Sequence, residues 1–337
     1  MFRVIVASLT LLIVLEGLVC ARDVLVIAHR GASAYLPEHT LEAYVMAYAQ
    51  GADYLEPDIV LTGDGVPIAL HDRTLEATTN VAETFPGRAR RDGRYYALDF
   101  TLAEIKQLSV RERVHPVTRL RVFRERFPNT HQELVFRVPT LAEIIELVQG
   151  LNAATGRWVG LYPETKASRW HGDQGYDLER SLLEVLDRYG LGSPEDPVFV
   201  QSFEPTSLQR LRALGSELEL VQLIGSGSLY DGLTSPEGLD TVAGYADGIG
   251  LGLSRVVDGR GRLVEDNALV RDAQARGLVV HVYTLRADRL PPFASTFDEL
   301  LELIVLEAGV DGVFTDHPDL VVRFLSVRTA VPVSGAS

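Results

Sequence analysis

The sequence predicts an α/β protein whose strands close into a (β/α)8 barrel, and three observations support this fold class. Short apolar runs rich in β-branched residues alternate with longer amphipathic stretches along most of the 337 residues. The runs are apolar on both faces, which is typical of parallel strands covered by helices. Eight such runs fit a closed barrel better than an open doubly wound sheet, and no GxGxxG motif follows the first run, which counts against a dinucleotide-binding fold.

The barrel is expected to span residues 22–329, with one strand for each apolar run and helices between the strands. A short hairpin that turns at Gly63-Asp64-Gly65 follows the second strand and leads into His71-Asp72. The expected strands are 24–29, 54–60, 158–163, 198–203, 218–224, 248–253, 278–284 and 312–315. The expected helices are 40–49, 141–154, 178–189, 206–214, 267–276 and 297–308.

Residues 73–138, called the insertion below, break this alternation. The segment is rich in Arg and Pro and contains one clear helical pattern, at 102–108. A structureless loop of that length is unusual inside a compact domain. We therefore expect the insertion to form a subdomain that caps one mouth of the barrel; a surface excursion without a functional role is the alternative.

The two ends of the chain are expected to lie outside the barrel. Residues 1–21 have the pattern of a secretory signal, because Arg3 precedes an apolar run over 4–15 that is too short to span a bilayer. Cleavage before Arg22 would export the protein to a periplasm or beyond. Acylation at Cys20, as in a lipoprotein, is less favoured because the preceding Val19 is bulky for such a site. Residues 330–337 are expected to form a C-terminal tail.

Composition excludes several classes of protein. Hydrophobic residues make up 46% and charged residues 23% of the chain, which is ordinary for a globular protein and excludes wholesale disorder. The 46 acidic residues exceed the 32 basic ones, and the formal charge of -14 repels phosphate backbones, so nucleic acid is not an expected partner. A small phosphorylated substrate is compatible with this charge if local cations offset it. Cys20 is the only cysteine, so no disulfide or thiolate metal site is expected within the chain. We expect a monomer or a homodimer without stable membrane insertion.

Three carboxylates lie at the ends of two neighbouring expected strands. Glu56 and Asp58 are two residues apart on an extended segment, so their side chains point to one side. Pro57 between them cannot donate a ladder hydrogen bond, which places the pair near the mouth of the barrel. Glu164 ends the next strand. Grouped carboxylates repel one another unless a cation lies between them, and oxygen ligands select a hard divalent cation such as Ca²⁺ or Mg²⁺.

Two basic residues and two histidines accompany these carboxylates. Arg30 and Lys166 could balance the charge of a phosphoryl group or could pair with the carboxylates instead, and Lys166 is one of only two lysines in the chain. His29 and His71 stand at expected strand ends, and a pair of groups that titrate near neutral pH can act as base and acid in one displacement. His39 is expected to cap the helix that follows it.

The residues singled out above lie within a set of short motifs spread along the chain. The motifs are His29-Arg30-Gly31-Ala32-Ser33, Pro37-Glu38-His39-Thr40, Gly51-Ala52-Asp53-Tyr54-Leu55-Glu56-Pro57-Asp58, Leu70-His71-Asp72, Arg91-Asp92-Gly93-Arg94-Tyr95-Tyr96, Tyr162-Pro163-Glu164-Thr165-Lys166, Gln201-Ser202-Phe203, Tyr245-Ala246-Asp247-Gly248-Ile249-Gly250 and Phe314-Thr315-Asp316. Taken together and in this order, they resemble the glycerophosphodiester phosphodiesterases, most of all the exported, periplasmic GlpQ-type branch.

The resemblance implies a (β/α)8 barrel with a subdomain inserted after the second strand. It also implies hydrolysis of glycerophosphodiesters, such as glycerophosphocholine and glycerophosphoethanolamine, to sn-glycerol 3-phosphate and an alcohol. The implied cofactor is one divalent cation, with Ca²⁺ favoured over Mg²⁺. Two alternatives are a phospholipase that acts on lysolipids with the same site, and a non-catalytic exported binding or adhesion protein.

The resemblance also implies a role for each matched residue. His29 would assist removal of the nucleophile's proton, and His71 would protonate the leaving group. Glu56, Asp58 and Glu164 would be the metal ligands, Arg30 and Lys166 would contact the phosphate, and Gln201 and Tyr283 would be further substrate contacts.

Overall fold

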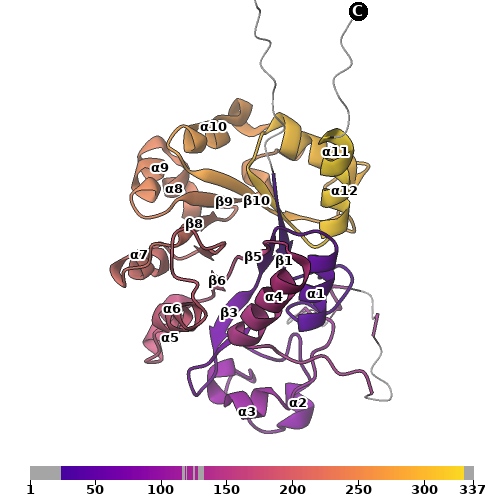
Figure 1. Ribbon diagram of the computed structural model, residues 1–337, viewed down its shortest axis with the longest axis vertical. Helices are drawn as coiled ribbons and strands as arrows, with labels where there is room; N and C mark the ends of the chain where they lie inside the picture. The colour runs from indigo at the N-terminus through magenta and orange to yellow at the C-terminus, as the bar shows by residue number, and fades with distance from the viewer. Residues whose placement is uncertain (1–23, 116–117, 119, 124–125, 128–132, 330–337) are drawn as a thin grey trace, which may run out of the picture.

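Short strands join into one curled sheet at the centre of the computed structural model, which describes residues 24–115, 118, 120–123, 126–127 and 133–329 (Figure 1). The strands are hydrogen-bonded in the order β4-β3-β6-β7-β8-β9-β10-β11-β1-β2-β5. Among the described residues they are β1 Leu25–His29, β2 Tyr54–Glu56, β3 Asp58–Leu61, β4 Pro67–Ala69, β5 Gly160–Leu161, β6 Glu164–Thr165, β7 Phe199–Ser202, β8 Glu219–Ile224, β9 Gly248–Gly252, β10 Val279–Leu285 and β11 Gly312–Thr315.

Two of the expected strands are each broken into two pieces. The expected strand 54–60 is divided at Pro57 into β2 and β3, and the expected strand 158–163 becomes β5 and β6 with Pro163 between them. The pairing keeps one register across both breaks, since Leu55 lies opposite Leu161 and Asp58 opposite Glu164. Proline lacks the N–H that a central ladder needs, which explains why the regular pairing stops there.

The ring of strands closes when β2 with β3 and β5 with β6 are each counted as one barrel strand; each such strand is called a stave below. β1 pairs with β2 on one side and with β11 on the other, both in parallel. The stave of β5 and β6 joins β7 through a bridge from Leu161 to Val198 and through pairing of Glu164 with Gln201. Among the strands of the described residues, β3 and β4 alone pair antiparallel, as the expected hairpin. The prediction of a (β/α)8 barrel is therefore confirmed.

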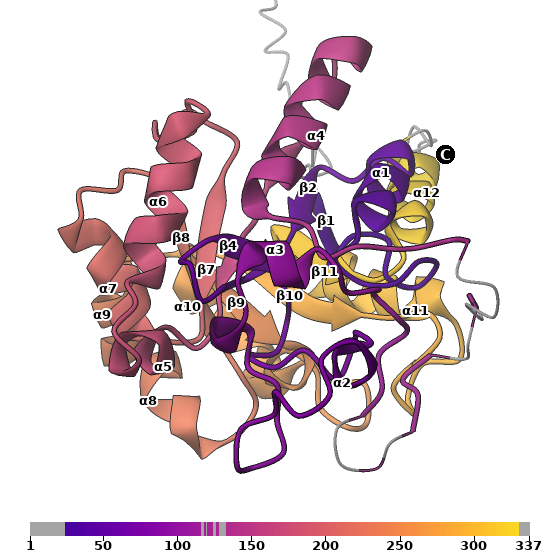
Figure 2. The ribbon, with the colours of Figure 1, turned by 90° about the horizontal axis from the view of Figure 1, so that it is seen from below.

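The helices lie outside the strands, as α6, α4, α1 and α12 show in Figure 2. Several start at a threonine whose side chain accepts a hydrogen bond from the backbone N–H three residues later, such as Thr40 before α1 and Thr140 before α4. The α-helices of the described residues are α1 Leu41–Ala49, α2 Val81–Thr84, α3 Leu102–Ile105, α4 Leu141–Thr155, α5 Ser168–Asp173, α6 Leu178–Arg188, α7 Pro205–Ala213, α8 Asp231–Thr234, α9 Pro236–Ala243, α10 Ala268–Gln274, α11 Phe297–Leu301 and α12 Pro318–Thr329. The expected helix 297–308 changes after α11 into a π-helical segment, Glu302–Glu307.

Buried apolar side chains fill both the space between strands and helices and the inside of the ring. The ring interior holds Ile27, Tyr162, Phe199, Val221 and Phe314. Large side chains there make the barrel a packed core rather than a pore. Substrate chemistry is thereby left to the mouth formed by the carboxyl ends of the strands.

The described part of the insertion has a small apolar core of its own, which includes Leu75, Phe100, Leu108 and Phe136. This core continues into the barrel through Val60 of β3, so the insertion is packed against the second stave. Figure 1 shows its helices α2 and α3 at the end of the molecule opposite α10 and α11.

Two expectations for the chain ends lie outside the described residues, the secretory signal over 1–21 with Cys20 and the tail over 330–337. Among the helices that are described, none combines the length and the apolar character that crossing a bilayer requires.

Candidate active site

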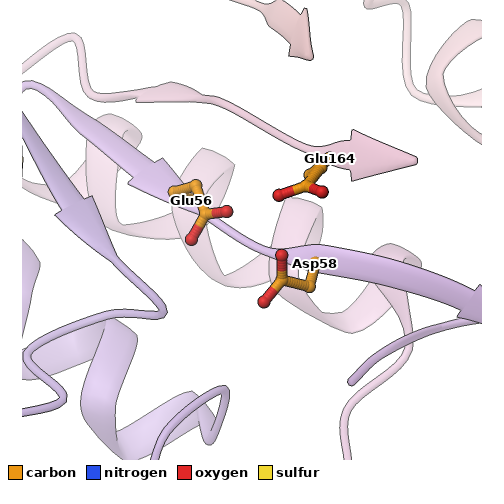
Figure 3. Close-up of side chains that lie close together, drawn as sticks. All are labelled: Glu56, Asp58 and Glu164. Carbon is orange, nitrogen blue, oxygen red and sulfur yellow. The ribbon is translucent and has the colours of Figure 1, made fainter. Parts of the chain in front are cut away.

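The three predicted carboxylates meet at the mouth of the barrel. Glu56 ends β2, Asp58 begins β3, and Glu164 begins β6, where it is the register partner of Asp58. Each offers one oxygen, and these oxygens lie within 4.8 Å of one another. Figure 3 shows the three side chains turned toward a common space. All three are buried, so their negative charges are concentrated where water screens them little.

The electrostatics of this cluster indicate a surplus of negative charge. Burial and the neighbouring carboxylates raise the pKa of Glu56 well above its usual value, and burial raises the pKa of Glu164 to about 8 although Lys166 opposes the rise. Burial also disfavours the charged form of Asp58, but Lys166, His71 and Arg30 outweigh it and hold the pKa of Asp58 well below its usual value. A cation among the three oxygens would offset both burial and repulsion and would favour the charged forms of Glu56 and Glu164.

The donor set fits a hard divalent cation. Its ligands are carboxylate oxygens, and the amide oxygen of Gln201 is buried beside them without a hydrogen-bond partner among the described residues. The Gln201 amide nitrogen donates to Glu56 Oε1 at 3.1 Å. Oxygen donors of this kind are those that Ca²⁺ and Mg²⁺ prefer.

Neighbouring residues hold the carboxylates in place. The Arg30 backbone N–H donates to Glu56 Oε2 at 2.9 Å. His39 Nε2 donates to Asp58 Oδ2 at 2.8 Å, and its Nδ1 lies 2.8 Å from the Tyr44 hydroxyl. The expectation that His39 caps the following helix is wrong, because Thr40 is the N-cap residue and His39 turns inward from a left-handed backbone position (φ 62°). Sequence reasoning missed this contact because it depends on the conformation of the loop after β1.

The two predicted cationic side chains lie against the carboxylates. Lys166 Nζ lies 2.8 Å from Glu164 Oε1 and 3.4 Å from Asp58 Oδ1. Arg30 Nε lies 3.2 Å from Asp58 Oδ2, and Arg30 Nη1 donates to Glu38 Oε1 at 3.1 Å. Pairing with the carboxylates, one of the two alternatives left open by the sequence, is therefore observed, and both side chains also line the pocket.

Each predicted histidine is held by an aspartate, and each aspartate by an arginine. His29 Nδ1 donates to Asp316 Oδ1 at 2.7 Å, and Asp316 Oδ2 lies 3.2 Å from Arg286 Nε. We call these three residues the barrel arm. It is built at the ends of β1, β10 and β11.

The second histidine has the same arrangement. His71 Nδ1 donates to Asp72 Oδ1 at 2.9 Å, and Arg113 Nη1 donates to Asp72 Oδ2 at 2.6 Å. We call these three residues the insertion arm, because Arg113 belongs to the insertion. In each arm the aspartate engages Nδ1 and fixes how the ring is oriented.

The surroundings of His71 keep its ring neutral near neutral pH. Burial, followed by the positive charges of Arg30 and Lys166, lowers the pKa of His71 to about 3. Asp72 stays ionised, because hydrogen bonding to His71 and the charge of Arg113 outweigh burial and lower its pKa. A ring with so low a pKa is a weak base, and the negative charge of a phosphate beside Arg30 and Lys166 would raise that pKa.

These groups surround a pocket of about 160 Å³. A larger hollow of about 690 Å³ shares Phe203, Tyr283 and Thr284 with it, and a groove of about 1400 Å³ shares Phe203. Asp58 is the one predicted site residue that does not line the pocket; it lies directly behind it. The predicted residues that line the pocket are His29, Arg30, Glu56, His71, Glu164, Lys166, Gln201 and Tyr283.

Comparisons with known proteins agree with this geometry. The model of the glycerophosphoryl diester phosphodiesterase family matches residues 29–320. A glycerophosphodiester phosphodiesterase of Haemophilus influenzae is 38% identical over 90% of both chains, and one of Treponema pallidum is 32% identical over 91% of this chain and 93% of its own. Among solved structures, a phosphodiesterase of Oleispira antarctica in complex with the product sn-glycerol 3-phosphate has a TM-score of 0.63 at 24% identity, covering 90% of this chain and 96% of its own.

Proposed function

The chain belongs to the glycerophosphoryl diester phosphodiesterase family and is a phosphodiesterase, and from that premise we propose that it hydrolyses glycerophosphodiesters such as glycerophosphocholine and glycerophosphoethanolamine to sn-glycerol 3-phosphate and an alcohol. The observation that carries the proposal is the convergence on one small pocket of a carboxylate triad, two cationic side chains and two aspartate-held histidines. The similar phosphodiesterase of Oleispira antarctica was solved with that glycerol phosphate product, which supports the same substrate class here.

Binding of the phosphate is assigned to Arg30 and Lys166. Both side chains line the pocket, and both are preoriented by carboxylates on their other side. Fixed positive charge at the place where negative charge develops on the phosphoryl oxygens lowers the barrier of phosphoryl transfer. Gln201 and Tyr283, on the walls of the same pocket, are assigned to contacts with the rest of the substrate.

The metal site is assigned to Glu56, Asp58 and Glu164, with Ca²⁺ favoured over Mg²⁺, as the resemblance implies. When bound, a divalent cation would supply positive charge next to the phosphoryl group and polarise its oxygen. The protein's own contribution is to keep the three carboxylates oriented: Arg30 and Gln201 hold Glu56, His39 holds Asp58, and Lys166 holds Glu164.

Proton transfer is assigned to the two histidines, in the order that the resemblance implies. His29 is fixed through Nδ1 by Asp316 and is assigned to taking the proton of the attacking hydroxyl or water. His71 is fixed through Nδ1 by Asp72 and is assigned to protonating the leaving alcohol, since a bound phosphate beside Arg30 and Lys166 would favour its charged form. Each group in such a role typically contributes ~10²–10⁴-fold to the rate.

A second candidate substrate class is the lysophospholipids. The groove that shares Phe203 with the pocket is lined by Trp170, Tyr230 and Leu229, and Leu229 is 86% exposed. Such a groove could cover an acyl chain. We favour the smaller diesters, because the predicted site residues surround the pocket of about 160 Å³ and none of them lines the described part of the groove.

We also propose, from the N-terminal apolar run alone, that the protein is exported and cleaved before Arg22. N-terminal sequencing of the protein from a periplasmic or culture fraction tests this. A mature chain that starts with acylated Cys20 would indicate a lipoprotein, and a chain that keeps Met1 in the cytoplasm would contradict export.

The experiment that tests the proposed activity is turnover of a substrate panel by the purified protein. The panel holds glycerophosphocholine, glycerophosphoethanolamine and lysophosphatidylcholine, with glycerol 3-phosphate and free choline as the measured products. We expect glycerol 3-phosphate from both glycerophosphodiesters. Turnover of lysophosphatidylcholine alone would favour the phospholipase, and absence of turnover on the whole panel would contradict the proposal.

A further inference from the structure

Arg113 of the insertion connects two parts of the site that are far apart in the sequence. Its Nε and Nη2 donate to the two carboxylate oxygens of Glu38 at 2.7 and 2.6 Å. Its Nη1 donates to Asp72 Oδ2 at 2.6 Å. Glu38 belongs to the loop after β1, and Asp72 follows the hairpin after β3, so one guanidinium joins the insertion to two barrel loops.

Each of those carboxylates holds a residue of the pocket. Glu38 Oε1 accepts a hydrogen bond from Arg30, and Asp72 Oδ1 accepts one from His71. The contacts form a continuous series, His71–Asp72–Arg113–Glu38–Arg30. Arg113 is therefore the residue through which the orientation of His71 is coupled to that of Arg30.

Burial makes these contacts hard to replace. The Arg113 side chain is 12% exposed and that of Glu38 is 5% exposed. Asp72 is 28% exposed and stands in a loop, so without Arg113 its carboxylate would lose the contact that holds it away from solvent. An arginine fits because three N–H groups of a planar fork serve two carboxylates, whereas a lysine ammonium cannot reach both with the same geometry.

We propose that Arg113 is a positioning residue for the phosphodiesterase reaction, which acts through Asp72 on His71 and through Glu38 on Arg30, and that the insertion is thereby a part of the active site. This rests on the proposed function of the pocket. Loss of a residue that orients a functional group through its partner typically lowers activity ~10–100-fold.

The test is a double-mutant cycle on the full-length protein with glycerophosphocholine as substrate. The variants are Arg113→Met, Asp72→Asn and the double variant, each checked for folding by thermal melting. We expect Arg113→Met to lower kcat/KM ~10–100-fold. We expect the kcat/KM of the double variant to be about the same as that of the less active single variant. We also expect Arg113→Lys to remain impaired: on a logarithmic scale, its kcat/KM should lie closer to that of Arg113→Met than to that of the wild type.

Arg90 supplies the matched control. It lies in the same insertion, is 35% exposed, and donates to the two carboxylate oxygens of Asp99 at 2.7 and 2.8 Å, without touching Asp72 or Glu38 among the described residues. The effects of Arg90→Met and Asp72→Asn should multiply, because the two residues share no partner in the described part of the chain. Arg113→Met at wild-type kcat/KM, or effects of Arg113→Met and Asp72→Asn that multiply, would overturn the inference while leaving the proposed function intact. A wild-type protein inactive on every diester would instead overturn the proposed function before any variant is compared.

Discussion

The two arms hold their histidines with the same chemistry but from different parts of the molecule. In the barrel arm, Asp316 is 4% exposed and follows β11, and Arg286 follows β10. In the insertion arm, Asp72 is 28% exposed, and its arginine comes from a segment outside the barrel repeat. The barrel arm is therefore fixed by the strands themselves, whereas the insertion arm is complete only when the insertion is packed in place.

This difference explains what the insertion contributes. A (β/α)8 barrel places side chains at strand ends, so it can supply the carboxylate triad and His29 without further structure. His71 lies beyond a hairpin, where the strand ladder no longer determines orientation, and Arg113 supplies the missing constraint. The insertion also reaches the barrel arm, but more weakly, through the ring of Phe123 at 4.7 Å from the Arg286 guanidinium carbon.

The largest effect is expected from a substitution in the carboxylate triad, which lies in the same site as both histidines. Asp58→Asn should lower glycerophosphocholine turnover ~10³-fold or more, because bound-metal charge stabilisation is worth several kcal/mol in such reactions. Glu83→Gln, at a 64% exposed carboxylate in the insertion, is the control and should retain full turnover. Wild-type turnover by Asp58→Asn would show that the triad has no part in catalysis.

Removing either imidazole ring disrupts one arm and should lower turnover somewhat less than Asp58→Asn does. His29→Ala and His71→Ala should each lower kcat ~10²-fold or more with the fold retained, because each ring is assigned a proton transfer in the proposed reaction. Circular dichroism confirms the fold, and steady-state kinetics gives the loss. If one variant kept near-normal kcat, that arm would be structural and the comparison between the arms would fail.

Removing the aspartates sharpens the comparison. Asp72→Asn and Asp316→Asn should each lower activity ~10–100-fold, since both leave a histidine less well oriented. Asp316→Asn should also lower the melting temperature more than Asp72→Asn, because Asp316 is 4% exposed and Asp72 is 28% exposed. Equal melting temperatures would contradict the distinction between a barrel arm and an insertion arm.

The smallest effect concerns stability against pH in the insertion arm. Burial and cationic neighbours lower the pKa of His71 to about 3, below the ~6.5 of an unfolded chain, so the unfolded state binds the extra proton first as pH falls. The free energy of unfolding therefore falls as the pH is lowered from ~6.5 to about 3, by on the order of 1 kcal/mol for His71. This is less than the pKa shift alone would give, because the ring is 31% exposed. Melting temperatures against pH should fall less steeply for His71→Asn than for wild type; parallel curves would exclude this linkage.

The pattern of strands and helices predicted the barrel and much of its site. Glu56 and Asp58 share a face because side chains alternate along a strand, and Glu164 meets them because the next stave keeps register across Pro57 and Pro163. The breaks themselves were not predicted, since apolar runs continue through both prolines.

The contacts that hold the site together were much less predictable. Arg113 lies 75 residues from Glu38 in the sequence, and its position depends on how the insertion folds, which no periodicity records. His39 was expected to act locally but turns toward Asp58. Asp72 carried a weak signal, because it directly follows His71, and so did Asp316 at the end of β11. Loop conformation is set by tertiary contacts, so these residues become visible only in the folded chain.

Calorimetric titration of Ca²⁺ into EDTA-treated protein, followed by a glycerophosphocholine assay at each addition, measures whether the triad holds a divalent cation on which turnover depends. We expect one ion bound per chain, with activity rising from background in step with occupancy, and no such binding by Asp58→Asn. Full turnover by the chelated protein before any ion is added, or saturation that leaves activity unchanged, would show that turnover does not depend on the ion.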